Sequence, residues 1–207
     1  MSEPIRAAIF DIGGVLVRTH DQSGRLAWER RLGLPPGGAE ATVLNSPMGH
    51  RAQRGEISDA ELWNWAGEVL GLGDDLPQFK IDFWRGDAVD ADLVNLIRRL
   101  RPRYRTAVIS NATDALLATL EGYGLLELFD LVVGSAYEGI MKPTPAIYRI
   151  ALDRLGVAAE ESVFVDDAPA NVAAAAALGM AAIRFTPDLD LESTLARLGL
   201  TLGSPAS

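Results

Sequence analysis

Short apolar runs that alternate with helical segments are the feature that most restricts how this chain can fold. One run lies near the start, at Ala7–Phe10, and further runs follow at 106–109, 131–133, 162–165 and 181–185. Runs of this length and composition are typical of buried strands in a parallel sheet. From residue 90 onward they are separated by segments of helical length, which predicts right-handed βαβ crossovers and helices on both faces of the sheet. The sequence therefore predicts an α/β fold.

The first apolar run ends abruptly in a carboxylate. Asp11 follows Phe10 directly, and Gly13 and Gly14 come next. Open α/β sheets bind their ligands at the carboxyl ends of their strands, which is where this aspartate is expected to lie. Glycines at this point allow a sharp turn and a close approach of the backbone to a ligand. An aspartate that merely opens a turn has the same local pattern, so the interpretation depends on the other strand ends.

Three later strand ends or loops carry groups of matching chemistry. Ser110 and Asn111 follow the second run, Lys142 lies in a loop after the third, and Asp166 and Asp167 end the fourth. Singly, they are explained by a turn, a solvated loop charge and a helix N-cap. Because the carboxyl ends of parallel strands meet at one edge, we expect all of them to line a single crevice.

The combined residue types indicate phosphoryl-transfer chemistry. Three crowded carboxylates repel one another unless a divalent cation lies among them, and oxygen ligands without His or Cys favour Mg²⁺. Ser110 can donate a hydrogen bond to a phosphate oxygen, and Lys142 supplies a compact positive charge. Asp11 could then attack phosphorus as a carboxylate nucleophile and form an aspartyl-phosphate.

Residues 18–90 differ from the remainder of the chain. The segment contains no strand candidate, and a capping box of Ser58 and Glu61 marks the start of one of its helices. It also holds every tryptophan of the chain, at positions 28, 63, 65 and 84. We expect a small helical domain at 18–90, inserted over the carboxyl edge of a core formed by 1–17 and 91–207. His20, Arg54 and Trp84 lie near its expected boundaries and are candidates for substrate contacts, without a firmer assignment.

The bulk composition excludes several functions. The 207 residues carry a net charge of −9, which disfavours a nucleic-acid or anionic-membrane partner. Because there is no cysteine, disulfides and thiolate chemistry are excluded. No segment approaches the roughly 18 apolar residues of a membrane helix, and the N-terminus lacks a signal-peptide pattern. We expect a cytoplasmic monomer or homodimer whose Gly/Ser/Pro-rich tail beyond Leu200 is frayed.

Four segments together resemble the motifs of the haloacid dehalogenase-like (HAD) hydrolases. They are Phe10–Leu16, Val108–Asn111, Gly139–Pro143 and Val163–Asp167 followed by Asn171. The resemblance covers about residues 5 to 185 and implies a Rossmann-like, three-layer core with a small helical cap inserted after the first strand.

The resemblance also implies a role for each matching residue. Asp11 would be the nucleophile and a Mg²⁺ ligand, and Lys142 would neutralise the nucleophile and the phosphoryl charge. The remaining implied site residues are Ser110, Asn111, Gly13 and Gly14 on the substrate side, and Asp167, Asp166 and the Gly13 carbonyl on the metal side.

Gly13 departs from the pattern of the family's phosphatases, which usually carry a general acid–base aspartate two residues after the nucleophile. General acid–base help contributes about 10²–10⁴-fold to a rate. Motif one is similar to that of α-D-glucose-1-phosphate phosphatases, whose anomeric leaving group needs less help. We therefore expect a Mg²⁺-dependent phosphatase acting on a small phosphate monoester, such as a sugar phosphate. A 2-haloacid dehalogenase and a catalytically inactive binding protein remain as alternatives.

Overall fold

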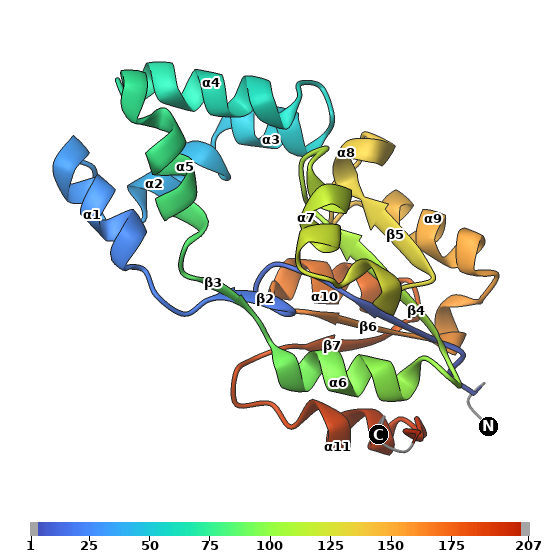
Figure 1. Ribbon diagram of the computed structural model, residues 1–207. Coiled ribbons are helices and arrows are strands. Elements are labelled where there is room, and N and C mark those ends of the chain that lie inside the picture. Colours follow the sequence, from blue (N-terminus) through green and yellow to red (C-terminus); the bar gives the residue numbers. More distant parts are fainter. Residues whose placement is uncertain (1–3, 204–207) are drawn as a thin grey trace.

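The centre of the molecule is a parallel sheet whose strands follow the order β5-β4-β1-β6-β7 (Figure 1). The computed structural model describes residues 4–203. The strands are β1 (Ala7–Phe10), β4 (Arg105–Ser110), β5 (Leu131–Gly134), β6 (Ser162–Asp166) and β7 (Ala181–Arg184). Each neighbouring pair is parallel, with Ala7 of β1 opposite Arg105 of β4 and Ser162 of β6. The predicted α/β fold and all five predicted strands are confirmed.

Helices cover both faces of this sheet, which makes the core three-layered. Side chains alternate between the faces along a strand, and β1 shows this directly. Ala8 and Phe10 pack in one apolar cluster with α6 (Ala91–Leu100), α7 (Leu116–Gly122) and α11 (Leu191–Arg197). Ala7 and Ile9 pack in the other with α9 (Pro145–Leu155) and α10 (Pro169–Ala177). Central strands buried on both faces explain the unbroken apolar runs of the sequence.

The segment between β1 and β4 carries a separate helical unit, at the upper left in Figure 1. Its helices are α1 (Ser23–Leu32), α2 (Gly38–Val43), α3 (Pro47–Gln53), α4 (Asp59–Val69) and α5 (Leu76–Trp84). They enclose their own apolar cluster, in which Trp28, Trp63, Phe79 and Phe83 pack edge-to-face or tilted against one another. The capping box of Ser58 and Glu61 begins α4 as predicted. We call this unit the cap.

The expectation that residues 18–90 contain no strand is wrong. Val17–Thr19 (β2) pairs antiparallel with Asp87–Val89 (β3) and forms a two-stranded ribbon between the cap and the core. Each strand has three residues, too few for a period-two pattern to show in the sequence. The ribbon is held in part by the hydroxyl of Thr19, which donates to Asp87 over 2.6 Å. The cap is thus joined to the core through a paired, not a loose, connection.

The expectation of a frayed tail beyond Leu200 is also wrong for residues 201–203. The Thr201 amide donates to the Tyr104 hydroxyl over 2.8 Å, and the Gly203 amide donates to the Arg99 carbonyl over 2.9 Å. Residues 204–207 lie outside the described part. Among residues 4–203, none of the helices has the length and apolar character that crossing a bilayer requires.

The cap also contacts the core directly, away from the ribbon. The Ser135 hydroxyl, at the start of α8 (Ser135–Glu138), donates to the Gln53 carbonyl over 2.5 Å. The Asp59 amide donates to Asp114 over 2.8 Å, and the Thr113 hydroxyl donates to Asp59 over 3.0 Å. Two of these core residues, Thr113 and Asp114, lie two and three positions after Asn111. The cap is therefore docked beside the carboxyl edge of the sheet.

Substitution of Gly55 by alanine tests whether the contact between the cap and the core contributes to stability. The φ of Gly55 is +68°, and an added Cβ would clash with the Ala136 carbonyl of the core. Gly71 has a similar φ of +64° but open space around the Cβ position. We expect Gly71→Ala to lower the free energy of unfolding by about 1 kcal/mol, from backbone strain alone. Gly55→Ala should cost about 1–3 kcal/mol more, because the contact must open. Urea unfolding of both variants measures the difference, and equal losses would show that the contact contributes nothing.

Candidate active site

The groups that the sequence placed at separate strand ends meet around one ammonium group. Lys142 Nζ lies 2.8 Å from Asp11 Oδ1 and 2.6 Å from Asp166 Oδ2. Asp11 follows β1 and Asp166 ends β6, and these two strands are adjacent in the sheet. Lys142 reaches them from the loop between α8 and α9, and all three residues are buried. Buried ion pairs of this kind are stable only when their remaining bonds are satisfied.

Asp166 is held in place by several donors in addition to Lys142. The Asn171 side-chain amide donates to both carboxylate oxygens, over 3.0 and 3.1 Å, and the Ala168 amide donates to Oδ1 over 2.8 Å. Asn171 lies in the first turn of α10, and the Tyr148 hydroxyl donates to its carbonyl over 3.1 Å. These bonds therefore hold the Asp166 carboxylate in one orientation.

Asp11 keeps one oxygen available. Its Oδ1 accepts from the Ile12 amide over 2.7 Å and faces Lys142. Among residues 4–203, no hydrogen bond reaches Oδ2. Burial raises the pKa of Asp11 to about 6, a rise that Lys142 opposes and Asp166 adds to. The carboxyl group is thus mainly ionised at neutral pH, with a free oxygen.

The site fits a divalent cation. Asp11, Asp166 and Asp167 each present an oxygen, and these oxygens all lie within 4.8 Å of one another. Three carboxylates against the single ammonium of Lys142 leave excess negative charge in one place. Partial burial and the charge of Asp166 raise the pKa of Asp167 as well. An all-oxygen donor set with this charge is the kind that binds Mg²⁺.

Gly14 provides the space that Asp167 occupies. Its φ is +75°, and a Cβ at this position would overlap the Asp167 carboxylate. Gly13 is different, because nothing lies within 4 Å of its Cβ position. The two glycines of the motif therefore have separate functions. Gly14 is required by packing and backbone conformation, whereas Gly13 leaves an opening at the surface beside Asp11.

The two polar residues after β4 differ in their bonding. Within residues 4–203 the buried Ser110 hydroxyl makes no hydrogen bond, so it is available to an incoming oxygen. Asn111 bonds the Lys142 backbone on both sides: its side-chain amide donates to the Lys142 carbonyl over 3.0 Å, and its side-chain oxygen accepts from the Lys142 amide over 2.8 Å. The structure thus brings Asn111 to the site as a clamp on the lysine backbone.

Sequence reasoning did not assign a site role to Asn171, Tyr148 or Ser135. Asn171 offered a signal, since it is an amide in an otherwise alanine-rich helix five residues after Asp166. Tyr148 and Ser135 gave no signal, because their partners lie 23 residues away in sequence, and for the Ser135–Gln53 bond 82 residues away.

The three residues of the cap that were candidates for substrate contacts pack or bond elsewhere. Arg54 pairs with Glu56 over 2.6 Å, and the Trp84 ring packs edge-on against Trp63 and Phe83. His20 is exposed, and its backbone amide bonds the carbonyl of Gly86 over 2.9 Å. None of these contacts places the three side chains at the Asp11 cluster.

Comparisons with known proteins agree with this geometry. The family model of the haloacid dehalogenase-like hydrolases matches residues 5–179. The sesquiterpene phosphatase AstK of Aspergillus oryzae is 29% identical over 192 residues, which cover 91% of this chain and 94% of the fungal protein. An (S)-2-haloacid dehalogenase of a Pseudomonas species is 27% identical over 200 residues, covering 88% and 85% of the two chains.

A solved structure shares the fold over most of the chain. It is a HAD-family enzyme of Bacteroides thetaiotaomicron, in complex with magnesium and inorganic phosphate. The two chains superpose with a TM-score of 0.77 over 92% of this chain and 98% of the other, at 21% identity. At this identity the likeness supports the fold, cap included, and not the substrate.

The two glycines give a matched test of the metal site. Gly14→Ala should displace the Asp167 carboxylate and lower Mg²⁺ affinity by about tenfold or more, an effect typical of groups that orient ligands. Gly13→Ala meets open space and should leave the affinity nearly unchanged. Melting temperature measured against Mg²⁺ concentration reports both affinities. Equal Mg²⁺ affinities for the two variants would contradict the assignment of Asp167 as a metal ligand.

Proposed function

The chain belongs to the haloacid dehalogenase-like hydrolases, and on this basis we propose that it is a Mg²⁺-dependent phosphatase of a small phosphorylated metabolite. The observation that carries the proposal is the buried cluster in which Lys142 Nζ lies between Asp11 and Asp166, with Asp167 close by. The cluster combines a nucleophile, a cation for phosphate charge and a set of metal ligands.

The first step needs an ionised carboxylate aimed at phosphorus. With a pKa of about 6, Asp11 is ionised at neutral pH, and its Oδ2 would attack the phosphorus of the substrate. The P–O bond to the leaving group breaks, and the leaving-group oxygen takes a proton from solvent. Lys142 and the Ser110 hydroxyl would stabilise the charge on the phosphoryl oxygens. Water then attacks the phosphorus of the aspartyl-phosphate, which releases phosphate and restores the carboxylate.

Asp11, Asp167 and the Asp166 carboxylate beside them would hold the cation. When bound, Mg²⁺ would offset the carboxylate charge and polarise the phosphoryl group. The opposing hypothesis, displacement of halide at carbon, uses Asp11 as the nucleophile but gives Asp166 and Asp167 no metal ion to bind. The similarity to a sesquiterpene phosphatase points in the same direction.

The absence of an acidic side chain at Gly13 limits the substrate. With no general acid at this position, turnover should favour leaving groups of low pKa. A sugar phosphate attached through the anomeric oxygen meets this condition, in keeping with the similarity of motif one to α-D-glucose-1-phosphate phosphatases. That closer assignment remains a prediction.

Phosphate release tests the proposed activity. A panel of p-nitrophenyl phosphate, glucose 1-phosphate, glucose 6-phosphate and farnesyl phosphate should show release with Mg²⁺ and little with EDTA. Asp11→Asn should lower kcat by about 10³-fold or more, because it removes the nucleophile. Asp188→Asn, at an exposed position, should keep full activity. Halide release from 2-haloacids in EDTA would favour the dehalogenase alternative, and no turnover with either class would favour a binding protein.

The open space at Gly13 allows a gain-of-function test. Gly13→Asp should raise turnover of an alkyl phosphate by up to about 10²-fold, because it adds a proton donor beside the leaving group. Turnover of p-nitrophenyl phosphate should change little, since its leaving group needs no proton. Gly13→Asn is the matched control with the same shape and no acid. Equal rates for the Asp and Asn variants on the alkyl phosphate would contradict this account of position 13.

A further inference from the structure

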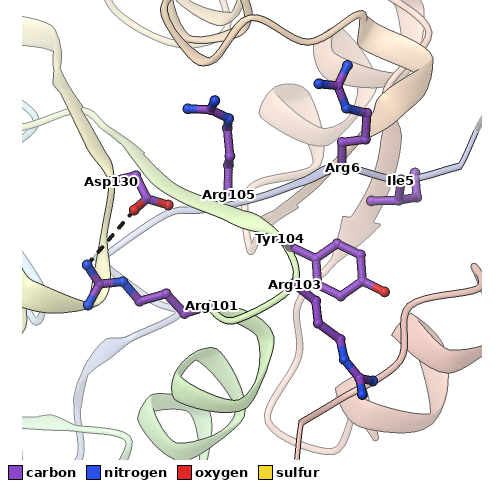
Figure 2. Close-up of a pocket in the computed structure, with 7 residues that line it drawn as sticks. All are labelled: Ile5, Arg6, Arg101, Arg103, Tyr104, Arg105 and Asp130. Atoms are coloured by element: carbon purple, nitrogen blue, oxygen red, sulfur yellow. Dashed lines mark ion pairs between the residues drawn. The ribbon is translucent and has the colours of Figure 1, made fainter.

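An arginine-lined hollow (Figure 2) lies at the amino ends of β1 and β4. The Asp11 cluster lies at the opposite, carboxyl end of these strands. The volume of the hollow is about 430 Å³, within the range of small-molecule sites. The lining residues are Ile5, Arg6, Arg101, Arg103, Tyr104, Arg105 and Asp130. Arg105 begins β4, whereas Ser110 ends it, so at about 3.3 Å per residue the two edges are about 16 Å apart. The hollow is therefore separate from the candidate active site.

The charge of the hollow is opposite to that of the protein. The chain has a net charge of −9, yet four arginines and one aspartate line this place. Asp130 is already engaged, because its Oδ2 accepts from the Thr106 amide over 2.9 Å. Its other oxygen is 3.9 Å from Arg101, beyond hydrogen-bond distance. Asp130 thus forms a loose ion pair with Arg101 and offsets one of the four positive charges.

Two of the four guanidinium groups lack an acidic partner in the described residues. Arg105 makes no side-chain hydrogen bond or ion pair within residues 4–203. Arg103 bonds only neutral oxygens, the Thr201 hydroxyl over 3.0 Å and the Leu202 carbonyl over 3.1 Å. Arg6 pairs with Glu161 over 3.1 Å at an exposed position. Arg103 and Arg105 therefore carry positive charges that no acidic side chain within residues 4–203 pairs with.

The backbone fixes where these side chains begin. The Arg105 amide donates to the Arg6 carbonyl over 2.9 Å, so the two arginines start from adjacent segments. In Figure 2 the Arg6 and Arg105 side chains extend in a similar direction, whereas the Arg101 and Arg103 side chains extend away from them and from each other. The Tyr104 hydroxyl accepts a hydrogen bond from the Thr201 amide over 2.8 Å, which fixes the position of the Tyr104 ring. Guanidinium groups bind phosphate oxygens in pairs and tolerate close neighbours better than ammonium groups.

We propose that this hollow is a second anion site, which binds a small molecule carrying two or more linked phosphates. Linked phosphates match several cationic groups spread around one hollow, whereas a single phosphate can engage only one side of it. The site does not depend on the proposed phosphatase activity, because it shares no residue with the Asp11 cluster.

Binding of inorganic pyrophosphate tests the proposal. Calorimetric titration uses the full chain carrying Asp11→Asn, at low ionic strength in buffer freed of divalent metal by a chelating resin, so that hydrolysis and metal binding do not contribute and no chelator competes as an anion. We expect saturable binding that Arg105→Gln weakens by about fivefold or more, through loss of a charge-assisted contact. Arg105 is chosen for substitution because its side chain makes no hydrogen bond or ion pair within residues 4–203. The variant should therefore keep the fold.

Arg149→Gln is the matched control, since Arg149 is an exposed arginine on α9 away from the hollow. It should leave the affinity for pyrophosphate unchanged. The proposal is overturned if pyrophosphate shows no saturable binding. It is equally overturned if Arg105→Gln, and the double variant with Arg103→Gln, both bind it as tightly as the parent.

Discussion

The contact on which the site depends is the buried ammonium of Lys142 between two carboxylates. Lys142 Nζ is within 2.8 Å of both Asp11 and Asp166, which come from different strands. Without this cation the two carboxylates would face each other in a buried place, at a cost of several kcal/mol. Even with it, three carboxylates outnumber one ammonium group, and burial raises the pKa of Asp11 to about 6, a rise that Lys142 opposes and Asp166 adds to. The same excess of carboxylates makes the site suited to a divalent cation.

The surrounding structure serves to hold that contact. The Asn111 side chain hydrogen-bonds both the amide and the carbonyl of Lys142, and the Asn171 side chain hydrogen-bonds the carboxylate of Asp166. The sheet contributes by placing β1 between β4 and β6, so that their carboxyl ends meet. The cap then docks at this edge through Ser135 and Asp59. Opposite this edge, the arginine-lined hollow has the reverse charge, so the two ends of the same sheet suit different ligands.

Local signals in the sequence were sufficient for most of the core. Buried apolar runs predicted the strands, and the capping box of Ser58 and Glu61 marked a helix start that the structure confirms. Pairings between distant segments gave no such signal. The β2–β3 ribbon joins residues about 70 apart, and α2 and α3 are short helices within a Gly- and Pro-rich stretch. For the site, residue types and order predicted the Asp11–Lys142–Asp166 meeting, whereas the clamping bonds of Asn111 required coordinates.

A covalent phosphoryl group on Asp11 is the most direct test of the central claim. Enzyme mixed with Mg²⁺ and a substrate that it hydrolyses is quenched in acid within one turnover, digested, and its peptides are analysed by mass spectrometry. The account predicts a phosphoryl group on the peptide that contains Asp11, located at that residue and absent from Asp11→Asn. Phosphate release by an enzyme that never carries this modification, or that carries it on another residue, would contradict the account.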